Sequence, residues 1–351
     1  MRWQSAIDSH VYDDDLKHHI DFTSGIFVAN VGHANKAVGA AIRNVDFFHT
    51  YTYGTDIRDY YIERLLARNP GFDACALFCS GCEAVEAALR VMRARSPIRQ
   101  AVLWVDGNFH GRTQGAAMRM YACKMSWPKN GEQPDVPVML RFCCAVILES
   151  YRGWDARFYP EGFVEKIQQL CVEHDLLLCM DEIQAGFGRT GKFWGHEHYP
   201  GCKPDLICFG KAVGGGVPLS GLLGRKELFE GVELTSTHGG HPLGCAAGLA
   251  VLNEIDRLDL VSESARKGEF MHQWLRKELP DVEIQGHGMV GALLTDSVNT
   301  ADHIVDSCRK YGLLVVQTSR PSVKLGPPLV ISDEDLLAGL QILKQAVHES
   351  I

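Results

Sequence analysis

The sequence has no long apolar run and no excess of basic residues. Its longest uninterrupted apolar stretches, such as residues 145–148 and 176–180, are far shorter than the ~20 residues that a membrane-spanning helix needs. The 35 Lys and Arg residues are outnumbered by 43 Asp and Glu residues, and the formal net charge is −8. No basic stripe stands out, so we expect neither a nucleic acid nor a membrane as a partner.

An apolar leader is also missing from the first fifteen residues, which contain an acidic cluster at residues 13–15. We therefore expect no signal peptide. The twelve cysteines are numerous enough for a disulfide framework, but several lie inside apolar runs, including Cys179 and Cys208. Without a secretory signal this placement is typical of buried, reduced thiols, and it predicts a cytoplasmic protein.

The length of 351 residues, with 46% hydrophobic and 22% charged residues, is typical of a globular protein of about two domains. Five short apolar runs recur along the first two thirds of the chain, at residues 74–79, 101–105, 145–148, 176–180 and 206–209. Such runs predict strands that are buried on both faces, and helical spacing appears at residues 84–95 and 163–173 between them. The alternation predicts an α/β doubly wound, mostly parallel sheet over about residues 40–230.

The pattern changes after Gly244. Helical periodicity covers residues 246–260 and 262–279, short strand-like pieces follow at 291–295 and 313–316, and a last helix begins at Asp333. We predict an N-terminal segment (1–40) that packs with the small domain, a large α/β domain (41–243) and a small C-terminal α+β domain (244–351). The connection 181–205 is long for a plain loop, which favours a functional role.

Polar residues follow the predicted strands at the ends where α/β sheets bind their ligands. These residues are Ser80, Gly81, Cys82, Asp106, Glu149, Asp181 and Lys211. The sequence therefore predicts that a phosphate-binding turn, carboxylates and one lysine meet at a single edge of the sheet.

The turn at Ser80, Gly81 and Cys82 allows three interpretations. It lies between a strand and a helix, where free backbone amides and the helix dipole favour a phosphate. Ser80 and Glu83 also have the spacing of a capping box, which is compatible with phosphate binding. Cys79 and Cys82 have the spacing of a redox C-x-x-C pair, although Cys79 belongs to the apolar run.

Two other patterns lack the context that they need. The G-x-G-x-x-G of residues 286–291 precedes a strand-like segment instead of a helix, so we interpret it as a turn and not as a dinucleotide site. The histidine groups at 18–19, 196–198 and 238–241 lack the spacing of known metal motifs, and we predict no metal site.

Lys211 ends an apolar strand and is followed by a glycine-rich segment, a setting in which a lysine can form a Schiff base. Asp181 takes the neighbouring position at the sheet edge. A lysine paired with a carboxylate suggests pyridoxal phosphate, which needs the first for its aldehyde and the second for its pyridine nitrogen.

The segments around Asp181 and Lys211 resemble those of a known family. Residues 181–191 (DEIQAGFGRTG), with 204–205 and 210–219 (GKAVGGGVPL), resemble the signature of class III aminotransferases of the ornithine and 4-aminobutyrate type. The resemblance continues in order through residues 24–33, 80–89, 109–113, 237–243 and 326–329, and so covers nearly the whole chain. It implies pyridoxal-phosphate-dependent fold type I, with a large, mostly parallel sheet domain and a smaller α+β domain.

The resemblance also implies roles for individual residues. Lys211 would form the covalent imine with the cofactor and then move the proton during the reaction. Asp181 would keep the pyridine nitrogen protonated, and Gln184 would contact the hydroxyl side of the ring.

Further residues would enclose the cofactor. Phe109 and Ile183 would lie on the two faces of the ring, and Gly81 and Cys82 would bind the phosphate with their amides. Thr237 would reach the same phosphate from the other subunit, which implies a homodimer with shared sites.

The chain departs from the family around the substrate. After Glu149, relatives typically have Pro-x-Gln-Gly-Glu, whereas this chain has Ser-Tyr-Arg-Gly-Trp, so a gating glutamate becomes Trp154. The arginine that grips the α-carboxylate becomes Lys324, which lacks the bidentate fork. We expect a weaker grip, or one supplied by another residue such as Arg152.

Ile26 falls where relatives contact the distal end of the substrate, and its apolar side chain argues against recognition of a polar α-amino group. Tyr51 and Tyr53 are further substrate-pocket candidates, although packing explains a tyrosine as well.

These features predict a transaminase that moves an amino group from an amine or ω-amino acid to an oxo acid by a ping-pong route. Three alternatives stay open. The first is another fold type I activity, such as a racemase or aminomutase. The second is a dithiol or nicotinamide oxidoreductase, and the third is a scaffold without catalysis.

Overall fold

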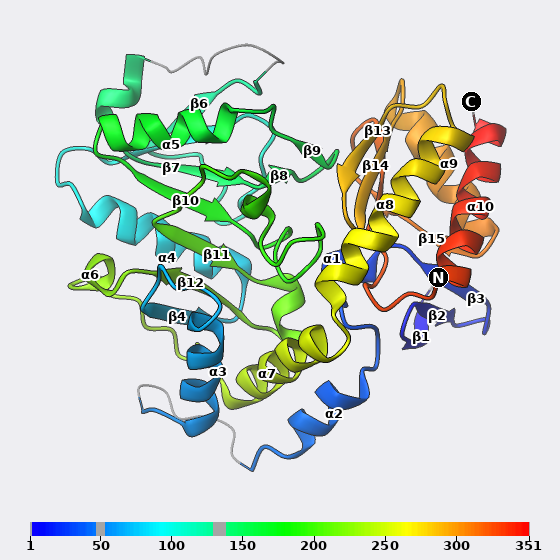
Figure 1. Cartoon of the computed structure of the whole chain (residues 1–351), viewed down its shortest axis with the longest axis horizontal. Helices are drawn as coiled ribbons and strands as arrows, with labels where there is room; N and C mark the ends of the chain where they lie inside the picture. The colour runs from blue at the N-terminus through cyan, green and yellow to red at the C-terminus, as the bar shows by residue number, and fades with distance from the viewer. Residues whose placement is uncertain (1, 47–52, 129–137, 351) are drawn as a thin grey trace.

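The computed structural model describes residues 2–46, 53–128 and 138–350, which form two lobes side by side (Figure 1). The larger lobe is built on a seven-stranded sheet, and the smaller one holds two four-stranded sheets. Among the described residues, no helix has both the length and the apolar character that crossing a bilayer requires.

The central sheet of the large lobe has the strand order β4-β12-β11-β10-β7-β5-β6. Its strands are β4 (Ala74–Phe78), β5 (Ala101–Val105), β6 (Ala122–Met125), β7 (Cys143–Glu149), β10 (Leu177–Asp181), β11 (Leu206–Phe209) and β12 (Ser220–Gly224). Strands β11, β10, β7, β5 and β6 are parallel, whereas β12 runs antiparallel to β11 and β4. All five predicted strands are confirmed; β6 and β12 lie outside the predicted runs.

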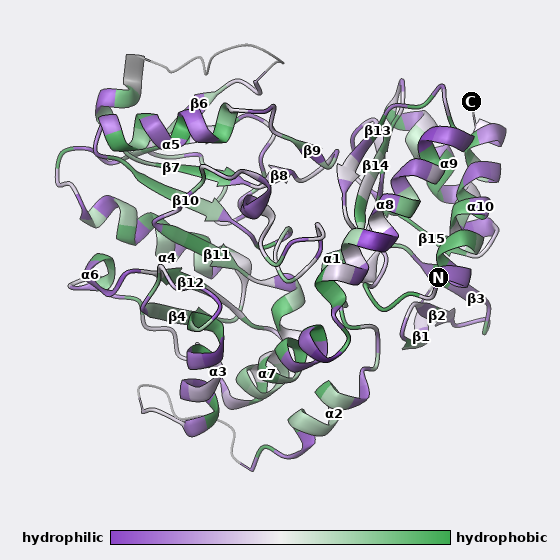
Figure 2. Ribbon diagram, viewed as in Figure 1, coloured by the Kyte–Doolittle hydropathy of each residue, from purple (hydrophilic) through white to green (hydrophobic). Residues whose placement is uncertain are grey.

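Alternate residues of the central strands face opposite layers of helices. In β7, Ala145 and Ile147 pack in the cluster that contains α4 (Gly81–Ala94), while Val146 and Leu148 pack in the cluster that contains α3 (Asp56–Leu66) and α5 (Phe163–Glu173). This two-sided burial explains why these strands are apolar without interruption. Figure 2 shows them as hydrophobic ribbons between helices of mixed character.

The small lobe contains the sheets β13-β14-β17-β16 and β1-β2-β3-β15. Their strands are β1 (Trp3–Ile7), β2 (His10–Asp13), β3 (His18–Asp21), β13 (Ile284–His287), β14 (Val290–Leu294), β15 (Leu313–Leu314), β16 (Val316–Gln317) and β17 (Ser322–Leu325). Helices α8 (Leu260–Glu278), α9 (Val298–Lys310) and α10 (Asp333–Ser350) complete the lobe. The N-terminal strands join it because β3 pairs with β15, and residues 286–291 lie in the β13–β14 hairpin.

Helix α7 (Pro242–Arg257) lies against α2 (Lys36–Arg43), α3 and the 3-10 turn η3 (Lys211–Gly214). The predicted domain boundary at Gly244 falls inside this helix. Because α7 packs mainly on the large lobe (Figure 1), we propose to place the boundary at the turn between α7 and α8.

The predicted functional loop 181–205 joins three parts of the molecule through Arg189, whose side chain is fully buried. Its guanidinium donates hydrogen bonds to Met289 O at 2.8 Å and to Asn30 Oδ1 at 2.6 Å, and also to Ser24 Oγ and Pro327 O. The loop is thus anchored to both the N-terminal segment and the small lobe.

Candidate active site

A cavity of about 190 Å³ lies at the carboxyl ends of β4, β7, β10 and β11. It is lined by Ser80, Gly81, Cys82, Phe109, His110, Gly111, Glu149, Asp181, Ile183, Gln184 and Lys211. Every residue predicted to bind the cofactor, except Thr237, is in this set. A larger cavity of about 800 Å³ lies between α2, α3 and α7, and the described residues that line it include no lysine, cysteine or histidine.

One end of the cavity is the start of α4. Ser80 caps the helix: its Oγ accepts a hydrogen bond from Glu83 N at 3.3 Å, and Glu83 Oε2 accepts one from Ser80 N at 2.8 Å. The predicted capping box is therefore confirmed. The first-turn amides of Gly81 and Cys82 have no acceptor within the helix, so they can serve an anion in the cavity.

Close approaches between segments shape this end of the cavity. A Cβ on Gly81 would lie 3.0 Å from Ile183 Cδ1. Gly111 has a φ of +143°, and a Cβ there would lie 2.8 Å from Cys82 Sγ. The Cys82 thiol accepts a hydrogen bond from Arg112 N at 3.4 Å. Glycine at these two positions therefore permits the helix start, the 109–112 segment and Ile183 to meet.

Lys211 follows β11 and has a left-handed φ of +46°, a conformation that is uncommon for a residue with a side chain. Burial of its ammonium group lowers the pKa of Lys211, while the carboxylates of Asp181 and Glu149 act in the opposite direction. Lys211 therefore lies near two acidic groups, in a buried site that disfavours the charged form of its amine.

Asp181 is the last residue of β10, and 4% of it is exposed. Its Oδ1 accepts a hydrogen bond from Ile183 N at 3.1 Å, and its Oδ2 lies 2.8 Å from Nδ1 of His110. The other ring nitrogen of His110, Nε2, is buried without a hydrogen-bond partner among the described residues. Such an orphaned polar atom beside a cavity is consistent with a ligand-binding site.

His110 is the residue of this site to which the sequence analysis gave no role. The sequence places it inside a segment that resembles the family, but its partner Asp181 lies 71 residues further along the chain. Only the parallel order of β5, β7 and β10 brings the two side chains together.

Glu149 ends β7 and is buried beside the cavity. Its Oε2 accepts hydrogen bonds from Phe109 N at 2.8 Å and Gly153 N at 3.1 Å. Burial raises the pKa of Glu149 to about 7; His110 and Lys324 oppose this rise, and Asp181 adds to it.

Replacing Glu149 by glutamine is expected to stabilise the protein more at pH 8 than at pH 5. The folded-state pKa of about 7 lies above the ordinary 4.5, so the native protein holds a proton that the unfolded chain releases between these values. Stability from this group is therefore lost as the pH rises through that window, by ~3 kcal/mol at most. Glutamine keeps an oxygen for both amide donors and does not ionise.

Melting temperatures of the wild type and Glu149→Gln, measured without cofactor at both pH values, test this expectation. The exposed Glu230→Gln is the matched control, with no pH-dependent difference expected. An equal difference between Glu149→Gln and the wild type at both pH values would contradict it.

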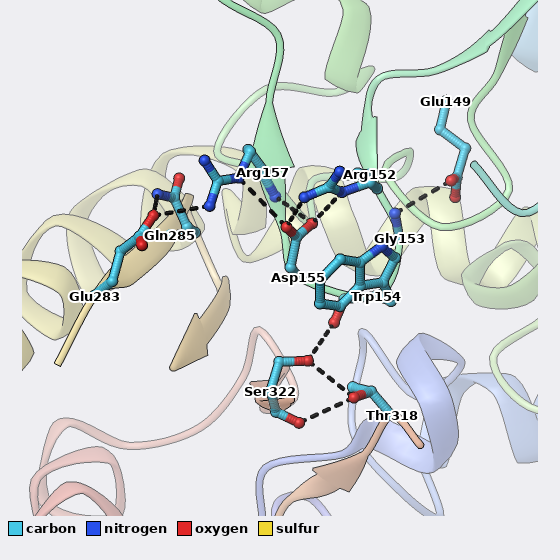
Figure 3. A network of polar contacts seen from close by, with 10 residues as sticks. All are labelled: Glu149, Arg152, Gly153, Trp154, Asp155, Arg157, Glu283, Gln285, Thr318 and Ser322. Carbon is cyan, nitrogen blue, oxygen red and sulfur yellow. Dashed lines mark hydrogen bonds and ion pairs between the residues drawn. The ribbon is translucent and has the colours of Figure 1, made fainter. Parts of the chain in front are cut away.

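Arg152 lies in the hairpin formed by β8 (Tyr151–Arg152) and β9 (Arg157–Phe158) (Figure 3). Its Nε donates to Asp155 Oδ1 at 2.9 Å, and its Nη2 donates to the other oxygen of the same carboxylate. The guanidinium carbon lies 4.4 Å from the ring centre of Trp127 and 4.7 Å from that of Trp154. The Arg152 guanidinium thus has partners within the protein and does not line the cavity, and its grip on a substrate carboxylate stays a prediction.

Lys324 and Trp154 lie beside the cavity and do not line it. Lys324 is 2% exposed, and burial lowers its pKa to about 7. Its Nζ donates hydrogen bonds to Gly153 O and Gln184 Oε1, two acceptors within the protein.

The remaining predicted residues lie outside the cavity of their own chain. Ile26 is 48% exposed and Tyr53 79% exposed, and Thr237 is also exposed. Tyr51 lies outside the described residues. Asp106 follows β5 at the predicted edge of the sheet, but it does not line the cavity: its exposed carboxylate faces Lys124 Nζ at 3.5 Å, on the neighbouring strand.

The chemistry of the cavity fits pyridoxal phosphate. An amine lies at the end of β11, a buried carboxylate at the end of β10, and the free amides of α4 suit a phosphate. Phe109 and Ile183 supply apolar surface between these groups.

The chain is similar in sequence and in fold to known proteins. The family profile "Aminotransferase class-III" matches residues 3–140 and 138–347. The acetylornithine aminotransferase of Archaeoglobus fulgidus is 33% identical over 95% of this chain and 92% of its own length. That of Methanosarcina mazei is 34% identical, over 94% and 87%. Among solved structures, a transaminase from the marine bacterium Virgibacillus has a TM-score of 0.92 at 20% identity, covering 99% of this chain and 93% of that protein.

Proposed function

The chain belongs to the class-III aminotransferases, and from this premise we propose that it moves an amino group from an amine or ω-amino acid to an oxo acid by a ping-pong route. Transamination with pyridoxal 5'-phosphate is the activity of this family, and the racemase, aminomutase and oxidoreductase alternatives are not favoured. The predicted fold type I architecture is confirmed. The residue assignments rest on one observation: a single cavity is lined by Lys211, Asp181 and the start of α4.

The bound cofactor supplies a conjugated ring that stabilises the negative charge left when a proton departs from the carbon bearing the substrate's amino group. Lys211 would hold the cofactor aldehyde covalently. Once a substrate amine has displaced it, Nζ of Lys211 would take that proton from the substrate carbon and would deliver it to the former aldehyde carbon of the cofactor. The lowered pKa of Lys211 supports this role, because only a neutral amine can act as a base.

The other cavity residues would fix the cofactor. Asp181 would keep a proton on the pyridine nitrogen, and its own orientation is held by His110 and by Ile183 N. The amides of Gly81 and Cys82 would bind the phosphate. Ile183 and the half-exposed Phe109 would lie on the two faces of the ring, with Gln184 beside its hydroxyl group.

A homodimer with shared sites is part of the proposal. Thr237 is exposed and absent from the cavity of its own chain, which suits a contact with the phosphate of a second copy. None of the twelve cysteines forms a disulfide, which supports the proposed cytoplasmic location.

Complementation between two inactive subunits tests the shared site. In a heterodimer of Lys211→Ala and Thr237→Ala subunits, one site would have both substitutions and the other neither. We therefore expect about half of the wild-type activity. If each site used its own Thr237, the heterodimer would have only half the activity of the Thr237→Ala homodimer.

The proposed donor class is tested by adding single amines to the cofactor-loaded protein without an acceptor. We expect ω-amino acids or simple amines to change the absorbance of the bound cofactor and to release a stoichiometric oxo product, identified by mass spectrometry. Turnover confined to α-amino acids would contradict the donor class. An unchanged absorbance with every amine would contradict transamination itself.

A further inference from the structure

Strand β17 presents two polar side chains to the β8–β9 hairpin. Ser322 and Lys324 are two residues apart and therefore point to the same face of the strand. Ser322 Oγ donates to Trp154 O at 2.9 Å, a contact drawn in Figure 3, and Lys324 Nζ donates to Gly153 O. One strand of the small lobe is thus attached to two consecutive peptide carbonyls of the large lobe.

Lys324 makes further contacts that Ser322 does not make. Its Nζ also donates to Gln184 Oε1, and it lies 4.5 Å from the ring centre of Phe27 and 5.2 Å from that of Tyr151. A lysine ammonium has three N–H groups. Two carbonyl oxygens and the faces of two aromatic rings therefore account for its donors and its charge within the protein.

The two acceptors of Lys324 connect it to the cavity. Gln184 lines the cavity, and its Oε1 also accepts a hydrogen bond from Tyr151 at 3.0 Å. Gly153 donates its N–H to Glu149, which lines the cavity as well. Lys324 is therefore one hydrogen bond away from the cavity residue Gln184 and two hydrogen bonds away from the cavity residue Glu149, although it does not line the cavity itself.

We propose that Lys324 is a positioning residue, which fastens the small lobe to the cofactor cavity through Gln184 and Gly153 and does not bind the substrate carboxylate. The inference rests on the proposed function, since it takes the cavity as the cofactor site. Without the ammonium group, Gln184 Oε1 keeps only Tyr151 as a donor from the described part of the chain, and the buried Gly153 carbonyl loses its lysine partner. A side chain that is free to rotate binds the cofactor less well than one held in place.

Cofactor affinity of the apoprotein, measured by fluorescence quenching without any substrate, tests this role. We expect Lys324→Met, which keeps the apolar stem and removes the donors, to weaken binding about tenfold or more. Ser322→Ala is the matched control, because it breaks the adjacent contact with the hairpin and leaves Gln184 untouched. We expect it to stay within about twofold of the wild type.

A double-variant cycle tests the connection to Gln184. If Lys324 acts through that side chain, adding Lys324→Met to Gln184→Ala should weaken binding much less than Lys324→Met does alone. Lys324→Leu, which also lacks donors, serves as a second variant if circular dichroism shows that Lys324→Met does not fold.

Three results would overturn the inference. Wild-type cofactor affinity in a folded Lys324→Met or Lys324→Leu would do so, as would an equal loss in Ser322→Ala. Unchanged cofactor affinity with a raised KM for the oxo acid would restore the predicted grip on the substrate carboxylate. A wild-type protein that binds no cofactor would refute the proposed function instead.

Discussion

Replacing Lys211 by alanine is expected to abolish covalent retention of the cofactor and to lower the transamination rate by at least about 10³-fold. Two functions disappear together, because the same amine would hold the cofactor aldehyde and carry the proton. Alanine also relieves none of the left-handed strain at this position, where φ is +46°, so a gain in stability from that source is not expected.

The measurements are the absorbance of the bound cofactor after gel filtration and the rate of oxo product formation. Lys203→Ala, at an exposed lysine of the preceding loop, is the matched control and should retain both. A Lys211→Ala protein with full turnover would contradict the assignment of Lys211 as the catalytic base.

Replacing Asp181 by asparagine is the second substitution for which a large loss is expected, of about 10²–10³-fold in rate. An amide is neutral and cannot hold a proton on the pyridine nitrogen by charge, although it fills the same space. Lys211 stays in place, so the cofactor should still be retained covalently. The loss should therefore appear in the rate constant and in the pH dependence of the cofactor absorbance, with the amount of bound cofactor little changed.

Asp106→Asn is the matched control for this effect. Asp106 directly follows β5, at the same edge of the sheet, but its carboxylate faces Lys124 and not the cavity. Its removal should leave both rate and absorbance unchanged. Equal losses in the two variants would show that the effect comes from the overall charge of the sheet edge and not from contact with the cofactor.

The strands that position the site were predictable because both of their faces are buried. Ala145 to Leu148 are apolar at every position, since successive residues meet opposite helical layers, and the same holds for Leu177 to Met180. The positions of Glu149, Asp181 and Lys211 then followed from the rule that the ends of parallel strands meet at one edge. Strand β12 escapes this logic because serine and glycine leave it only the two consecutive apolar residues Leu222 and Leu223.

The contacts between side chains were not predictable in the same way. The pairing of His110 with Asp181 and the bidentate contact of Arg152 with Asp155 depend on the distance and orientation of groups that the sequence does not fix. Arg152 could be assigned to the substrate from its position in the chain alone. Its true surroundings, two tryptophan rings and a buried carboxylate, appear only in the folded protein.

The substrate side differs most from the expectation carried by family resemblance. The resemblance predicts that Lys324 stands where relatives have a carboxylate-binding arginine, yet its amine is surrounded by protein oxygens and aromatic rings. The cavity itself contributes acidic groups, Glu149 and Asp181, beside the lysine that would hold the cofactor.

Borohydride reduction of the cofactor-loaded protein, followed by peptide mass analysis, tests the central claim most directly. Reduction fixes the cofactor to the amine that holds it. We predict the added mass on one peptide, the one that contains Lys211. A label on a different lysine, or no label on protein supplied with ample vitamin B6, would contradict the account.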